Sequence, residues 1–190
     1  MIAFGRVLNV LLLVLSLSCL VCASPSPRMS VHKSRAVSAR QESGSLAPLD
    51  VLEGTMRKQL DACLKAKTQE DAKAVVTEVV LQIKTCTASL KQLGKLEVDA
   101  SVAAAVATRS ATCVELVIKL LFKLTRKFGS DFVLSLCIEI DAVLKELLLA
   151  LDGCISGVLK LLVLKLVDVK TSAIMQFDLR QCAQVLGLTA

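Results

Sequence analysis

A seam of apolar residues that recurs at alternating steps of four and three is the most regular pattern in the chain. Its members are Ala72, Val76, Val79, Ile83, Cys86, Leu90 and Leu93. This spacing places them on one face of a helix, as in a coiled-coil seam of about three heptads. Thr68, which is followed by two acidic residues, is suited to cap the start of this helix, and Gly94 is suited to end it. The pattern predicts a helix over residues 68–93.

The stretch from Cys113 to Val169 is the most apolar part of the body, and it is interrupted only near Gly129 and Gly153. Helices that are apolar over more than half of their circumference must be covered on nearly all sides, by other helices or by lipid. Asp99 and Phe128 bound one predicted helix here, and Ser130-Asp131 is suited to cap the next. Charged residues recur along each helix, so we expect the centre of a bundle and no membrane span.

The predicted helix over residues 131–152 has a polar arc of about 160°, at 100° per residue. Its members are Asp131, Ser135, Glu139, Asp141, Lys145, Glu146 and Asp152. Ile138 and Leu149 also fall inside this arc. These two residues are therefore candidates for an exposed apolar face that contacts a ligand or a partner.

Three further helices complete the prediction. One begins at Pro48, since proline suits a first helical turn, and has Leu49, Leu52, Met56, Leu60 and Cys63 on its apolar face. Another covers 155–169, although alternation from Leu164 to Lys170 leaves a strand as the alternative. The last covers 171–188, with Met175, Leu179, Cys182 and Leu186 on one face. We predict an all-α fold, a single disulfide-stapled bundle of five to six amphipathic helices.

The first residues do not belong to this bundle. A basic residue, an apolar run over 7–21 and small residues ending at Ala23 are typical of a secretory signal peptide, which we place at residues 1–23. Residues 24–45 are rich in serine, proline and basic residues and predict a disordered spacer, and residues 46–190 form the helical domain. Most of the formal net charge of +6 lies before the body, which keeps about +2. We therefore expect a secreted, extracellular protein.

Six of the eight cysteines remain after signal cleavage: Cys63, Cys86, Cys113, Cys137, Cys154 and Cys182. An even number in an exported chain favours disulfides, and three bridges could join helix to helix. The alternative is that each cysteine is a small buried apolar residue. The spacing does not select among the fifteen possible connectivities.

The sequence lacks residue types that several kinds of catalytic and binding site require. The only histidine, His32, lies in the spacer, so the body has no base for serine or cysteine catalysis and no histidine ligand for zinc. The chain has no Trp or Tyr to stack on sugars or nucleic-acid bases. We therefore expect no enzymatic activity, no cofactor, no metal and no nucleic-acid partner.

The signal peptide, the Ser/Pro-rich spacer, the leucine- and valine-rich helices with scattered single cysteines and the ending VLGL resemble small secreted helical proteins of basidiomycete fungi. The resemblance implies an effector-like virulence role, in which a non-enzymatic protein contacts a host or extracellular protein partner. The alternative is an extracellular protein that binds a lipid ligand or a hydrophobic surface. Burial of the apolar excess in a homo-oligomer is a third reading.

Overall fold

The structure is a computed structural model that describes residues 33–166 and 168–188. The chain divides into two compact units, residues 1–35 and 36–190, and the second contains all helices from α3 to α8. The described residues form seven helices and no strand, so the all-α prediction is confirmed. The helices are α2 (Lys33–Lys65), α3 (Gln69–Leu93), α4 (Ala100–Phe128), α5 (Ser130–Cys154), α6 (Val158–Lys165), α7 (Asp168–Gln176) and α8 (Arg180–Val185).

The boundaries of α3 and α4 follow from local capping. The Thr68 hydroxyl accepts a hydrogen bond from the Asp71 amide at 3.1 Å, and the Asp71 carboxylate accepts one from the Thr68 amide at 3.0 Å. These reciprocal bonds form a capping box. The Asp99 carboxylate similarly accepts the amides of Ser101 and Val102 at the start of α4. The caps predicted at Thr68 and Asp99 are therefore confirmed. The cap predicted at Ser130-Asp131 is wrong, because α5 begins directly after Gly129 and has no side-chain cap hydrogen bond.

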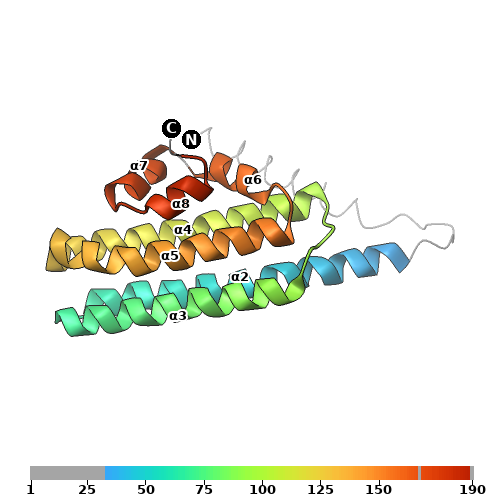
Figure 1. The fold of residues 1–190 in the computed structure, drawn as a ribbon. Coiled ribbons are helices and arrows are strands. Elements are labelled where there is room, and N and C mark those ends of the chain that lie inside the picture. Colours follow the sequence, from blue (N-terminus) through green and yellow to red (C-terminus); the bar gives the residue numbers. More distant parts are fainter. Residues whose placement is uncertain (1–32, 167, 189–190) are drawn as a thin grey trace, which may run out of the picture. The chain divides into compact units, whose positions relative to one another are not determined.

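The second unit has its helices in three layers (Figure 1). α2 and α3 form one layer, α4 and α5 lie in the middle, and α6, α7 and α8 form the third. α3 packs on α5 from one side, whereas α6 packs on α4 and α8 on α5 from the other. The middle layer is thus covered on two opposite faces, which explains why its sequence is so apolar.

The buried positions of α4 show the same arrangement. Val102, Val106, Ala107, Ser110, Ala111, Cys113, Val114, Leu116, Val117, Ile118, Leu120, Leu121 and Leu124 are all buried. They occupy more than one face of the helix. By length and composition alone, α4 is also apolar enough to cross a membrane. In the structure, α5, α6 and α7 pack on α4, and its Arg109 contacts Glu53 of α2.

The start of α2 differs from the prediction. The helix begins at Lys33 and Pro48 lies inside it, whereas we expected Pro48 in the first turn and a disordered spacer over 24–45. A proline removes one intrahelical hydrogen bond but does not prevent helix on its N-terminal side. Residues 24–32 and the signal peptide lie outside the described residues. The apolar face predicted after Pro48 includes Leu49 and Leu52, which are both buried.

The C-terminal part also needs correction. The helix predicted over 155–169 is shorter and ends at Lys165, and no strand forms among the described residues near it. The helix predicted over 171–188 is two helices, α7 and α8, separated by a turn in which Asp178 has φ 54°. The turn buries Phe177, whose ring packs edge-to-face on Phe122 with centroids 4.8 Å apart. Met175 consequently points outward and is 56% exposed.

Candidate functional site

The six body cysteines are free thiols in the structure, and all of them are buried. Cys63, Cys86 and Cys113 lie in α2, α3 and α4, while Cys137 and Cys154 lie in α5 and Cys182 lies in α8. No bridge is present, so the structure shows the bundle without the predicted disulfides. Each sulfur sits where a small apolar side chain would also fit.

Burial raises the pKa of every one of these thiols. It raises the pKa of Cys86 to about 12 and that of Cys137 to about 11. Burial also raises the pKa of Cys113 to about 12, with a further contribution from the neighbouring Cys86. Thiolate is the reactive form of cysteine, so these raised pKa values keep the folded thiols unreactive at neutral pH.

Cys154 joins the end of α5 to the end of α3. Its thiol donates a hydrogen bond to the Leu90 carbonyl at 3.0 Å, and its own carbonyl accepts the Leu96 amide at 2.8 Å. These two contacts fix the 94–99 link against α5. Cys154 therefore has a structural role even as a free thiol.

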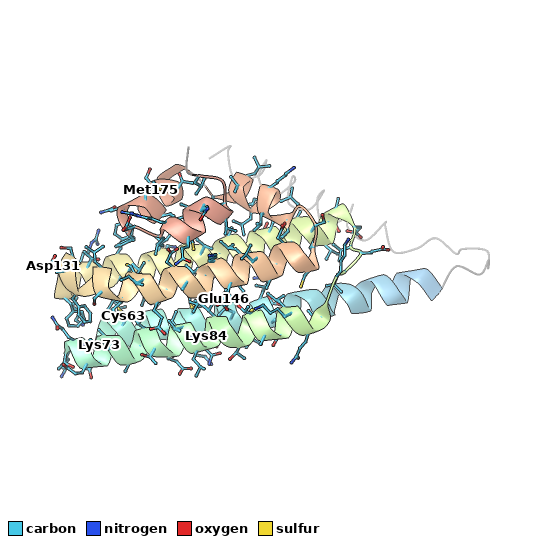
Figure 2. All side chains as sticks on the ribbon, in the orientation of Figure 1. Cys63, Lys73, Lys84, Asp131, Glu146 and Met175 are labelled. Atoms are coloured by element: carbon cyan, nitrogen blue, oxygen red, sulfur yellow. The ribbon has the colours of Figure 1, made fainter. Side chains whose placement is uncertain are left out.

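The fold separates Cys63 from Cys154. Cys63 lies shortly before Thr68 at the start of α3, and Cys154 contacts Leu90 near the end of α3. A helix rises about 1.5 Å per residue, so these two levels are about 30 Å apart. A disulfide needs Cα atoms within about 7 Å. Figure 2 shows Cys63 toward the same end of the bundle as Asp131. A bridge between Cys63 and Cys154 is excluded in this fold.

A buried carboxylate, Glu53, links α2 to α4. One of its oxygens, Oε1, accepts from Arg57 Nη2 at 2.7 Å, and Oε2 accepts from Arg109 Nη1 at 3.0 Å. Arg109 also contacts Asp50 at 3.3 Å. The Arg57 hydrogen bond, together with Arg109, holds the pKa of Glu53 below its usual value. This cluster was not predicted from the sequence, although Glu53 and Arg57 have the spacing of a helical ion pair.

A second buried carboxylate, Asp141, holds α8 against α5. Its two oxygens accept the backbone amides of Gln181 and Cys182, each at 2.9 Å. These amides belong to the first turn of α8, so a side chain of α5 satisfies groups that α8 leaves without intrahelical partners. Sequence reasoning placed Asp141 on the polar, solvent-facing arc of its helix, and this placement was wrong because α8 covers it.

One outward face of α5 carries apolar side chains. Leu134 is 44% exposed, Ile138 is 75% exposed and Leu149 is 50% exposed. Ala142 lies between them and is half-buried. We call Leu134, Ile138, Ala142 and Leu149 the α5 stripe, since steps of three and four residues or their sum place them on one face. The structure thus exposes both residues predicted for an apolar face, Ile138 and Leu149.

Charged residues border the α5 stripe. Glu139 on α5 pairs with Lys84 on α3 at 3.6 Å, and both side chains are more than half exposed. Lys145 donates to the Gln181 side chain at 3.2 Å. A cavity of about 350 Å³ adjoins the stripe and is lined by Lys91, Lys95, Glu146, Leu149, Ala150 and Cys154, among others. Figure 2 shows Lys84 and Glu146 on the neighbouring helices α3 and α5.

No three His, Cys, Asp or Glu side chains in the described part of the chain gather as a set of metal ligands. The chain matches no model of a protein family, and neither curated proteins nor solved structures give a match to it. Among the described residues, Ile138 of the α5 stripe is the most exposed large apolar side chain after Leu164.

Proposed function

We propose that this chain is a secreted, non-enzymatic interaction protein, comparable to the effectors that fungi export to contact a host or extracellular partner. The α5 stripe is the observation that carries this proposal. Its apolar side chains are exposed within a face that is otherwise charged. An apolar patch with a polar border is typical of a surface that contacts another molecule.

The use of the polar groups supports the same proposal. The buried carboxylates Glu53 and Asp141 are occupied by structural hydrogen bonds. The cysteines, which are the strongest nucleophiles of the body, are buried and have raised pKa values. These groups stabilise the contacts between helices, which suits a rigid scaffold that presents a surface.

The proposal includes disulfide bonds that join the helices of the exported protein. Cys86 and Cys113 both lie beside the same segment of α2. The Cys86 thiol donates to the Pro48 carbonyl at 3.5 Å, and Cys113 lies one helical turn after Arg109, which contacts Asp50. In the exported protein, these two thiols would lose two protons and two electrons to a disulfide-exchange oxidant. Peptide mapping without reduction should then find the Cys86–Cys113 bridge, and a Cys86→Ser variant that is secreted and folded as usual would argue against stapling.

Site-specific photo-crosslinking tests the interaction proposal. A photoreactive phenylalanine analogue at position 138 should capture a defined protein in the extracellular fluid where the protein acts, or a second copy of the chain. The same analogue at position 164 is the matched control, because Leu164 is 80% exposed but lies on α6, away from the α5 stripe. Equal or absent capture at both positions contradicts the proposal.

Binding of a lipid is the second candidate function, and the cavity beside Leu149 favours it. Leu149 and Ala150 provide apolar walls, and Lys91, Lys95 and Glu146 lie at the same cavity, so two lysines outweigh one carboxylate. An amphiphile with an anionic head group would match this combination. Native mass spectrometry should find such a ligand after mild purification, whereas an unliganded mass together with no binding to vesicles removes this candidate.

A further inference from the structure

We propose that a cavity between α6 and α8 binds a zwitterionic amphiphile with a single hydrocarbon chain, whose anionic group contacts Lys160 and whose cationic group contacts Asp152. The cavity has a volume of about 610 Å³. It shares no lining residue with the cavity beside Leu149. The inference goes beyond the proposed function, because it assigns a ligand to a part of the molecule that the α5 stripe does not include.

The packing of the third layer leaves this cavity open. Within the layer, α6 packs mainly on α4, and α8 packs mainly on α5 (Figure 1). Residues of both helices line the cavity, so it occupies the space between them. Gly157 before α6 and Gly187 after α8 also line it, and neither carries a side chain that would fill it. A volume of this size lies within the range of about 300–1,000 Å³ that is typical of sites for small ligands.

The walls of the cavity are apolar. They are formed by Leu159 and Val163 of α6 and by Val185 and Leu186 of α8. Leu159 and Val163 each follow a buried residue by one position, so they lie about 100° around α6 from its core-facing side. Both are only half-buried, as is Val185. A hydrocarbon chain in the cavity would therefore cover apolar surface that the fold leaves partly exposed to water.

The polar residues of the cavity carry charges of both signs. Asp152, Ser156 and Lys160 follow one another at steps of four residues, and all three are exposed. Among the residues that the structure describes, none forms a hydrogen bond or ion pair with their side chains. The carboxylate of Asp152 and the ammonium group of Lys160 are thus both free to contact a ligand at the same cavity.

These charges select the class of head group. An anionic head group would attract Lys160 but would also bring a second negative charge to the cavity of Asp152. A cationic head group would have the opposite conflict with Lys160. A head group that carries one charge of each sign satisfies both residues, and the apolar walls accommodate its chain. The cavity beside Leu149 differs, since its two lysines outnumber its one carboxylate.

Titration calorimetry with dodecylphosphocholine, below the concentration at which it forms micelles, tests this inference on the purified protein. At the binding energy per atom typical of ligands of this size, we expect a dissociation constant on the order of 10 µM. Dodecanoate and dodecyltrimethylammonium carry twelve-carbon chains with a single negative or positive charge. Each should bind at least about 10-fold more weakly, because it loses one charged contact.

Two substitutions test the roles of the charged residues. Lys160→Ala and Asp152→Ala should each weaken the binding of dodecylphosphocholine by about 10-fold. They should also change the selectivity in opposite directions. Asp152→Ala should bind dodecanoate better than dodecyltrimethylammonium, and Lys160→Ala should show the reverse preference. A general effect on folding would not produce this exchange, and circular dichroism of each variant establishes that it is folded.

Lys165→Ala is the matched control, because Lys165 is an exposed lysine of α6 that does not line the cavity. It should leave the binding unchanged, as should Leu149→Ala in the other cavity. Absence of binding up to micelle formation overturns the inference, and so does equal affinity for the three amphiphiles. Binding that is lost in Leu149→Ala and kept in Lys160→Ala also overturns it, since the ligand would then occupy the cavity beside Leu149.

Discussion

The hydroxyl of Ser110 is buried inside α4 and has no hydrogen-bond partner among the described residues. A buried polar group without a partner costs roughly 1–3 kcal/mol. We expect Ser110→Ala to raise the free energy of unfolding by about 1 kcal/mol, since alanine also has the higher helix propensity. Urea unfolding measures this change, with Ser89→Ala as the control, because the Ser89 hydroxyl lies inside a helix and donates to the Thr85 carbonyl. A loss of stability in Ser110→Ala would show that the hydroxyl is bonded.

The Glu53 carboxylate stabilises the contact between α2 and α4 through Arg57 and Arg109. Replacing it by glutamine removes the charge at nearly constant volume, and we expect a loss of about 1 kcal/mol in urea unfolding at pH 7. The pKa of Glu53 is lower in the folded chain than its usual 4.5, so its contribution is present above pH 4.5 and is lost as the pH falls through the folded value. The difference between wild type and Glu53→Gln should therefore shrink in acid, and a constant difference contradicts the assignment.

The contribution of the buried thiols to stability is lost at high pH, whereas that of Glu53 is lost at low pH. Burial raises the pKa of Cys86 from 9.0 to about 12, so the folded state favours the neutral thiol. Its stabilising contribution is complete below pH 9 and is lost as the pH rises toward 12. In the reduced protein at pH 9, iodoacetamide should modify the folded thiols at least about 100-fold more slowly than the same thiols in urea. Comparable rates would mean that the thiols are accessible.

At the scale of the elements, a single side chain of α5 positions the C-terminal helices. Asp141→Asn keeps one acceptor oxygen and leaves one of the two α8 amides, those of Gln181 and Cys182, without a partner. We expect faster hydrogen exchange in α8, corresponding to a local loss of about 1–3 kcal/mol, with little change in α3. The exposed Asp152→Asn is the matched control. Unchanged exchange in α8 would show that Asp141 does not hold it.

The elements that sequence analysis predicted well are those whose signals are local. The capping box at Thr68 and Asp71 and the seam of α3 depend on residues within a few turns of one another. The solvent-facing arc of α5 was only partly correct. Ile138 and Leu149 are exposed, but Asp141 is covered by α8, which is distant in sequence.

The C-terminal break and the start of α2 could not be read from periodicity. Leu179, Cys182 and Leu186 keep helical spacing and are all buried, yet a turn separates α7 from α8 so that Phe177 can pack on Phe122. Phe122 belongs to α4, which is distant in sequence, so the local pattern around Phe177 could not predict this contact. Pro48 is compatible with either a first turn or a helix interior that lacks one hydrogen bond, so its position alone did not fix where α2 begins.

At the scale of the whole second unit, the three layers explain the apolar middle of the sequence. α4 and α5 lie between α2–α3 and α6–α8, so most of their circumference is covered within one chain. The part of the apolar excess that remains uncovered on α5 is the α5 stripe. The stripe is therefore available for contact with another molecule, and the remaining apolar surface of these helices belongs to the core.

Site-specific photo-crosslinking at position 138 tests this central claim most directly, because it reports a contact at the α5 stripe itself. A photoreactive phenylalanine analogue at position 138 should capture a defined protein, whereas the same analogue at position 164, in place of the 80% exposed Leu164 of α6, should not. Equal capture at both positions, or no capture at position 138, would contradict the assignment of the α5 stripe to contact with another molecule.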